Sequence, residues 1–229
     1  EPYRRQRQMC IRDRSRLDQL DRKAAKRRGE QRPDRRKGGK GGKWNDHSRR
    51  PERHTPRRWA VIDELNFLGI LPGIYFIFSR NGCDQAVEQC INAGLELTTD
   101  DEMRRIRRIV DEMVEGQLSQ EDLKALHFSQ FRFALEEGFA PHHAGMVALF
   151  RQIVERLFEE GLVKVVFATE TLALGINMPA RCVVVEKLEK FDGTGHVGLT
   201  PGEFTQLTGR AGRRGIDTIG HAVVVDHHG

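Results

Sequence analysis

Residues 146–168, MVALFRQIVERLFEEGLVKVVFA, predict a helix that is followed at once by a buried strand. Apolar residues recur there at intervals of three and four, as on one face of a helix: Met146, Leu149, Phe150, Ile153, Val154, Leu157 and Phe158. Gly161 stands where a helix C-terminal glycine is favoured. The continuous apolar run 163–168 is typical of a strand covered on both faces.

The same alternation extends along the chain in both directions. Further apolar runs of strand length lie at 74–78, 182–185 and 222–225. Helical spacing occurs at 61–68 and 83–91, and two capping-box pairs, Thr99 with Glu102 and Ser119 with Asp122, open helices that we expect to end near 114 and 138. This pattern predicts an α/β fold in which helices cover both faces of a parallel sheet. Ligands of such folds bind at the carboxyl ends of the strands, and we expect the polar, glycine-rich segments there.

The charge is distributed unevenly between two parts of the chain. Residues 1–58 hold 22 Lys and Arg against 8 Asp and Glu, a charge of +14, whereas residues 59–229 carry −9. We therefore predict a disordered basic tail at 1–58, acting as a nucleic-acid contact or as a solvated linker, and a folded body at 59–229. The first dozen or so residues read as foreign to the rest and are left out of the fold. The chain itself reads as a fragment of a longer protein.

Composition excludes several classes of protein. The longest strongly apolar stretch, 69–78, is too short to cross a bilayer and contains Pro72. No secretory signal is visible. The four cysteines, Cys10, Cys83, Cys90 and Cys182, form no CxxC pair, so neither a zinc site nor a disulfide scaffold is indicated. A reduced, cytoplasmic protein fits best, with Cys83 and Cys90 as packing residues.

The segment 199–217, LTPGEFTQLTGRAGRRGID, carries the clearest chemistry. Thr200, Pro201 and Glu203 predict a helix start. If the helix continues, Gln206, Arg210 and Arg213 share one face and offer an amide and two guanidinium groups to phosphate oxygens. Gly209 and Gly212 between them would let a ligand or a second domain approach closely. The alternative is a solvent-facing basic helix end.

Three other patterns are assigned structural roles. The pair His142-His143 has no third ligand at metal-binding spacing, and adjacent strand residues point to opposite faces, so no metal site is expected. Asp217 is expected to pair with Arg213 or Arg214. The sequence AVIDEL (60–65) imitates a magnesium-binding strand but has helical spacing, and no GxxxxGK[ST] phosphate loop is present.

Four segments, in this order along the chain, resemble helicase motifs. YFIFSR (75–80) resembles motif IV of superfamily-two helicases, HHAGM (142–146) the motif between IV and V, FATETLALGINMPA (167–180) motif V, and QLTGRAGRRG (206–215) motif VI. The body from 59 to 229 thus resembles the second RecA-like domain of a superkiller-type DExH-box RNA helicase. The segments 64–87 and 186–193 bring it nearest to the actinobacterial HelY-like branch.

The resemblance implies roles for single residues. Arg210 and Arg213 would be arginine fingers that reach ATP phosphates across an interdomain cleft, and Gln206 would contact the phosphates or the attacking water. Gly175 and Asn177 would lie near the nucleotide. The nucleic-acid track would be lined by Ser79, Arg80, His143, Gly145, Thr169 and Glu170.

The resemblance also implies a division of labour. ATP with Mg²⁺ would be bound mainly by a first RecA-like domain joined in cis, which carries the phosphate loop and DExH box that this chain lacks. The parent protein would be an ATP-dependent RNA helicase, and this chain alone would not hydrolyse ATP. The alternatives are a non-catalytic RNA-binding module and a DNA helicase lobe of the same superfamily.

Overall fold

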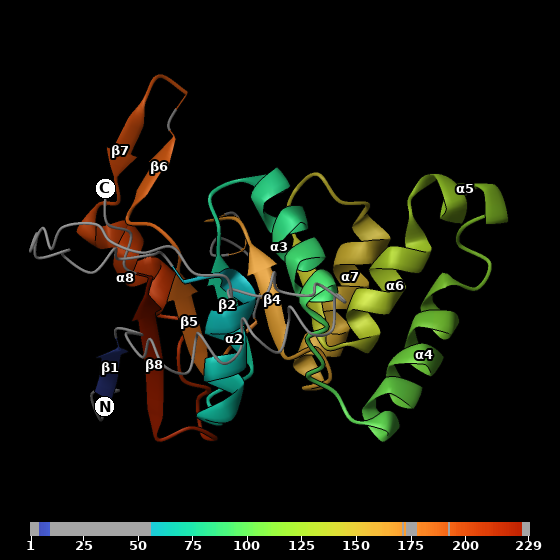
Figure 1. The fold of residues 1–229 in the computed structure, drawn as a ribbon, viewed down its shortest axis with the longest axis horizontal. Helices are drawn as coiled ribbons and strands as arrows, with labels where there is room; N and C mark the ends of the chain where they lie inside the picture. Colours follow the sequence, from blue (N-terminus) through green and yellow to red (C-terminus); the bar gives the residue numbers. More distant parts are fainter. Residues whose placement is uncertain (1–4, 10–55, 171, 173–177, 192, 226–229) are drawn as a thin grey trace, which may run out of the picture.

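The computed structural model describes residues 5–9, 56–170, 172, 178–191 and 193–225. Its centre is a six-stranded parallel sheet with the strand order β1-β8-β5-β2-β4-β3 (Figure 1). The predicted α/β fold is confirmed. The strands span Arg5–Met9 (β1), Gly73–Phe76 (β2), Phe139–His142 (β3), Val165–Ala168 (β4), Cys182–Val185 (β5) and Ile219–Val224 (β8).

Each face of the sheet buries its own apolar core, because successive strand residues point to opposite faces. On β2, Ile74 and Phe76 belong to one core, and Tyr75 belongs to the other. Helices cover both cores, as predicted. The first core packs against α4 (Asp100–Val114), α6 (Phe128–Glu136) and α7 (Ala148–Glu159), and the second against α2 (Arg58–Phe67) and α3 (Arg80–Ala93).

Both helix starts predicted from capping boxes are confirmed. The Thr99 backbone N–H donates to Glu102 at 2.9 Å at the start of α4, and the Ser119 N–H donates to Asp122 at 3.1 Å at the start of α5 (Gln120–Ala125). A capping box needs only residues three apart, which is why the sequence alone locates it.

The prediction of one helix from Ser119 to about Gly138 is wrong. The helix is interrupted between α5 and α6 at His127, whose backbone adopts a left-handed conformation with φ of 51°. The break turns Phe128 and Phe131 toward Phe150 on α7, and the rings of Phe131 and Phe150 stack with centroids 4.5 Å apart. Tertiary packing of the aromatic rings therefore overrides local helix propensity.

Two strands of the six-stranded sheet were not expected from the sequence. β3 contains Pro141, which cannot donate to a ladder, but in the described part of the chain β3 is the edge strand beside β4. β1 lies within the segment predicted as a disordered tail and pairs along β8 from Arg5 beside Ile219 to Met9 beside Val223. An edge strand joins a sheet through backbone hydrogen bonds, which do not require a regular spacing of apolar residues. Neither strand could therefore be recognised from the hydrophobic pattern of the sequence.

A two-stranded antiparallel hairpin projects from the body beside α8 (Figure 1). It consists of β6 (Glu189–Phe191) and β7 (His196–Gly198), and α8 spans Pro201–Thr208. In the part of the chain that the structure describes, no helix has the length and apolar character needed to cross a membrane.

Candidate functional site

The helix start in the most informative segment is formed as predicted. Pro201 occupies the first turn of α8, the Thr200 hydroxyl accepts the Glu203 backbone N–H at 3.3 Å, and the Glu203 carboxylate accepts the Thr200 N–H at 2.8 Å. This capping box fixes where α8 begins and therefore the direction in which Gln206 projects.

The helix ends earlier than the sequence analysis assumed. α8 stops at Thr208, so Arg210 and Arg213 are not on it, and the prediction of one shared helix face is wrong. Instead the chain pairs with Ala180: the Ala180 N–H donates to the Arg210 carbonyl at 3.2 Å and the Gly212 N–H donates to the Ala180 carbonyl at 2.7 Å. These tertiary hydrogen bonds replace the ones that a continued helix would have made.

The three side chains nevertheless line one cavity, of about 840 Å³. A turn, not a helix face, brings them together. Gln206 is exposed, while Arg210 and Arg213 are half-buried. Burial lowers the pKa of the Arg210 guanidinium, which remains cationic at neutral pH. The cavity is completed by Pro72, Phe158, Glu159, Gly161, Pro179, Thr205, Gly209, Gly212, Arg214 and Ile216.

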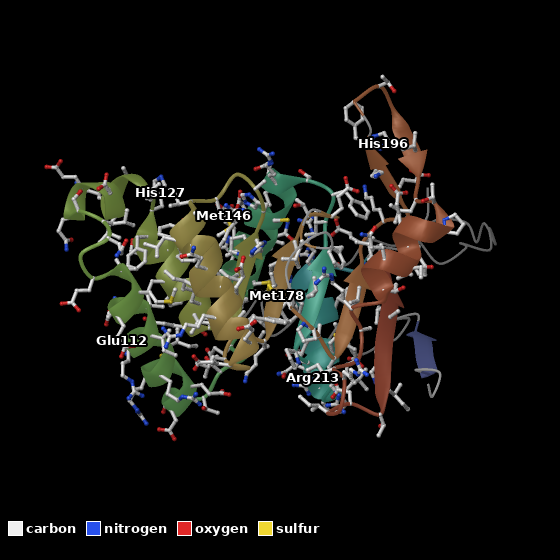
Figure 2. All side chains as sticks on the ribbon, turned by 180° about the vertical axis from the view of Figure 1, so that it is seen from behind. Glu112, His127, Met146, Met178, His196 and Arg213 are labelled. Carbon is white, nitrogen blue, oxygen red and sulfur yellow. The ribbon has the colours of Figure 1, made fainter. Side chains whose placement is uncertain are left out.

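The cavity lies at the amino ends of the strands. Pro72, Gly161 and Pro179 precede β2, β4 and β5, and the turn that carries Arg213 precedes β8. Figure 2 shows Arg213 at one end of the sheet and Met146, which follows β3, at the other. The expectation that all polar, glycine-rich segments gather at the carboxyl ends is therefore wrong for this segment. A loop between a helix and the next parallel strand must lie where that strand begins.

Asp217 pairs with Arg213, one of the two arginines that the sequence predicted as its partner. The Nε and Nη2 atoms of Arg213 donate to the two carboxylate oxygens at 2.9 and 3.0 Å, and its backbone N–H adds a third bond at 2.9 Å. The Asp217 side chain is only 6% exposed. The hydrogen bonds from Arg213 lower the pKa of Asp217 and raise the pKa of Arg213, so both groups stay charged.

Gly220 on β8 is a residue that the sequence analysis missed. A methyl group built on it would lie 2.4 Å from the Ala211 carbonyl oxygen, and one built on Gly212 would lie 3.2 Å from the Gly220 backbone. Gly212 also has φ of 91°. The expected close approach at Gly212 is thus made by the lobe's own strand. The sequence signal for this contact was the glycine that opens an apolar strand run.

The residues expected to contact a nucleic-acid strand gather at the opposite, carboxyl edge of the sheet. Ser79 and Arg80 follow β2, the pair His143 and Gly145 follows β3, and Thr169 with Glu170 follows β4. Because β2, β4 and β3 are neighbours in the sheet, all six residues share one edge. Ser79 also accepts the Gly82 N–H at 3.2 Å and so begins α3.

The two adjacent histidines diverge, as expected. His142 Nε2 lies 2.8 Å from Glu155 on α7, and His143 Nε2 lies 3.0 Å from Asp84 on α3. Burial lowers the pKa of His142. The Gly145 N–H donates to His143 Nδ1 at 3.2 Å, so a neutral His143 ring carries its proton on Nε2 and donates it to Asp84. Among the described residues, no cluster of three or more His, Cys, Asp or Glu side chains is placed to hold a metal.

Glu170 is paired within the lobe. The Lys190 ammonium donates to Glu170 at 2.9 Å and to Glu203, the capping-box residue of α8, at 2.6 Å. Lys190 stands in none of the four motif-like segments of the sequence. Two carboxylates from different elements therefore share one cation at the base of the hairpin.

The remaining predicted residues fall into two groups. Gly175 and Asn177 lie outside the described residues. The AVIDEL segment lies within α2, which confirms its interpretation as a helix.

Comparison with known proteins identifies the family. Residues 105–215 match the helicase conserved C-terminal domain. The chain is 58% identical over 172 residues to the probable helicase HelY of Mycobacterium tuberculosis (strain CDC 1551 / Oshkosh), covering 75% of this chain and 19% of that protein. It is 39% identical over 174 residues to the DExH-box ATP-dependent RNA helicase DExH11 of Arabidopsis thaliana and 35% identical over 175 residues to the antiviral helicase SKI2 of Saccharomyces cerevisiae.

Each of the last two alignments covers 76% of this chain and 13% of the relative. The chain thus spans less than a fifth of the length of these curated relatives. Together with the parallel sheet, these matches show that the chain belongs to the Ski2-like helicases and corresponds to their C-terminal helicase lobe.

Proposed function

We propose that this chain is the second lobe of an ATP-dependent RNA helicase and that it supplies Arg210 and Arg213 to ATP bound against a first lobe. The observation that carries the proposal is that Gln206, Arg210 and Arg213 line one cavity although they do not share a helix. The helicase names of the relatives support the assignment.

The donor set fits the phosphate end of ATP. Two guanidinium groups and the NH₂ of a carboxamide offer hydrogen-bond donors that a polyanion can accept. Bound ATP would supply a phosphoryl group on which negative charge accumulates as it is transferred. Arginines that are already positioned stabilise such charge, and one arginine finger is worth on the order of 10³–10⁵ in rate. We assign the phosphate loop and the Mg²⁺ ligands to the first lobe, because this sequence has no GxxxxGK[ST] segment.

The carboxyl edge of the sheet would hold the nucleic-acid backbone. The Arg80 side chain, the Thr169 hydroxyl and the backbone N–H groups of the adjoining loops are donors suited to phosphate and sugar oxygens. The nucleic-acid edge and the nucleotide cavity are then at opposite ends of the strands. Movement of this lobe relative to the first lobe would shift the carboxyl edge of the sheet along the nucleic-acid strand. The same movement would bring the arginines to the nucleotide or withdraw them from it.

The test is complementation with a first lobe. We expect this chain alone to show no ATPase activity, and the two-lobed helicase that contains it to show ATPase activity stimulated by RNA. Arg213→Ala should lower turnover by about 10³-fold or more, the range of an arginine finger, while the lobe remains folded. Arg108→Ala, which removes an exposed arginine of α4, is the matched control. Normal turnover of Arg213→Ala would refute the catalytic assignment.

The basic segment favours a second candidate, a module that binds RNA without catalysis. Its +14 charge would release counterions on binding, so affinity would fall steeply with salt. Deleting residues 1–55 should then remove most RNA affinity and most of the salt dependence. Equal affinity of the truncated chain would refute this candidate, and comparing RNA with DNA of the same sequence would test the preference for RNA.

A further inference from the structure

Lys190 lies where the nucleic-acid edge of the sheet meets the helix that leads to the nucleotide cavity. It belongs to β6, at the base of the hairpin that projects beside α8 (Figure 1). Its ammonium bridges Glu170, which follows β4, and Glu203, in the first turn of α8. The two carboxylate oxygens that accept from Lys190 lie no farther apart than the sum of the two hydrogen-bond lengths, 2.9 and 2.6 Å. The positive charge of the ammonium offsets the repulsion between the two carboxylates.

Glu203 is fully engaged on both of its oxygens. Oε2 accepts the Thr200 backbone N–H and hydroxyl, both at 2.8 Å, and Oε1 accepts from Lys190 at 2.6 Å. The hydrogen bond from Lys190 is the main cause that lowers the pKa of Glu203 to about 2. The carboxylate that caps α8 is therefore the same one that the hairpin lysine holds.

The α8 helix runs from this network to the cavity. Its eight residues extend about 12 Å at the standard helical rise. Thr200 and Glu203 lie at its start, whereas Gln206 lies near its end and the turn with Arg210 and Arg213 follows. A helix of two turns moves as a rigid element, so a displacement of its first turn reaches the residues that line the cavity.

We propose that Lys190 is a positioning residue that couples occupancy of the nucleic-acid edge to the nucleotide cavity. This inference rests on the proposed function. A phosphodiester that reaches the loop after β4 repels the Glu170 carboxylate, and Lys190 passes that change to Glu203 and so to α8. Lys190 itself contacts neither the strand nor the nucleotide in this scheme.

The experiment compares Lys190 variants in the two-lobed helicase. ATP turnover is measured without nucleic acid and across an RNA titration. In Lys190→Met, turnover without RNA should be unchanged, while the stimulation by saturating RNA should fall by at least about fivefold, the low end of measured coupling between sites. The RNA concentration that gives half-maximal stimulation should change little, because binding contacts are retained. Lys190→Arg keeps both pairings and should restore stimulation.

The control is Lys187→Met, which removes an exposed positive charge three residues away. Loss of stimulation in that variant too would indicate a general charge effect and overturn the inference. So would full stimulation in Lys190→Met, or an equal fall of the basal and stimulated rates, which would indicate a structural defect. If the unmodified helicase shows no stimulation by RNA, the proposed function itself fails.

Discussion

The Arg213 guanidinium and the Asp217 carboxylate pair side-on: Nε and Nη2 of Arg213 donate to the two carboxylate oxygens at 2.9 and 3.0 Å. An arginine has five N–H donors, so this pairing leaves three of them for an anion. The backbone N–H of Arg213 donates to the same carboxylate, which ties the side chain to its own turn. Asp217 thus orients the arginine and leaves part of its donor set for the phosphate contact proposed above.

Replacing Asp217 by Asn should therefore slow the two-lobed helicase without abolishing its activity. An amide cannot accept on both of its terminal atoms, so Arg213 loses its fixed orientation, and a misplacement of about 1 Å lowers kcat by up to about 100-fold. The KM for ATP should change less. Steady-state kinetics would check this, with the exposed Asp100→Asn as control. An unchanged kcat would show that Arg213 does not need this partner.

Replacing Gly220 by Ala should displace the turn that carries the arginines. The new methyl group would meet the Ala211 carbonyl at 2.4 Å, and rigid backbone on both sides cannot yield cheaply. We expect a loss of about 1–3 kcal/mol in the free energy of unfolding, as for overpacked cores. Gly202→Ala is the matched control, because no atom lies within 4 Å of its added methyl group on α8. Denaturant unfolding of the chain would measure both, and equal stability of the two variants would contradict the packing argument.

The Glu203 carboxylate should make the lobe sensitive to acid. Its pKa is lowered from 4.5 to about 2, chiefly by Lys190, so its stabilising contribution is complete above pH 4.5 and is lost as the pH falls toward 2. In Glu203→Gln this contribution is absent. The difference in unfolding free energy between the unmodified chain and the variant should be constant near neutral pH and shrink below pH 4.5. A difference that does not depend on pH would argue against the Lys190 pairing.

The three described cysteines should be unreactive in the folded chain. Burial raises the pKa of Cys83 and Cys182 to about 12 and also raises that of Cys90, so little thiolate forms at neutral pH. In a Cys10→Ser variant, an aromatic disulfide reagent should label thiols only at the rate of unfolding, and denaturant should expose all three. Rapid labelling of any thiol in the native protein would contradict their assignment as packing residues.

Arg58 should contribute to the stability of the folded body although it was counted with the basic tail. It donates to the Glu186 carboxylate at 2.5 and 3.1 Å, and both side chains are less than 20% exposed. Arg58→Met leaves that carboxylate unpaired and should cost about 3 kcal/mol. The double variant Arg58→Met with Glu186→Leu removes both charges and should recover most of the loss, as thermal unfolding would show. For this reason the tail deletion proposed above stops at residue 55.

Patterns made of neighbouring residues predicted the local structure. The capping boxes at Thr99, Ser119 and Thr200 were placed correctly, because a helix start is decided by residues three positions apart. The apolar face of α7 and the continuous apolar strands were placed correctly for the same reason. Helix ends were predicted less well. α5 stops before His127 and α8 stops at Thr208, because the residues that follow make bonds and contacts with distant parts of the chain.

The candidate site divides in the same way. Its chemical groups could be named from the sequence, because Gln206, Arg210 and Arg213 stand within eight positions in a motif. Their arrangement could not, since a helix face was expected and a turn paired with Ala180 was found. Lys190 could not be identified from the sequence, because its partners lie 13 and 20 residues away and no local period reports such contacts.

The sequence by itself determined that this protein is a parallel α/β lobe with arginines suited to phosphate and with capped helices that begin at stated residues. Only the tertiary structure decided that the arginines proposed to bind phosphate and the residues proposed to contact nucleic acid occupy opposite ends of the sheet, and that α8 runs between them. The physical reason is the sequence distance over which each interaction acts, because hydrophobic periodicity and helix capping involve residues only a few positions apart. The position of a loop relative to a sheet depends on which strands become neighbours, which the whole fold sets.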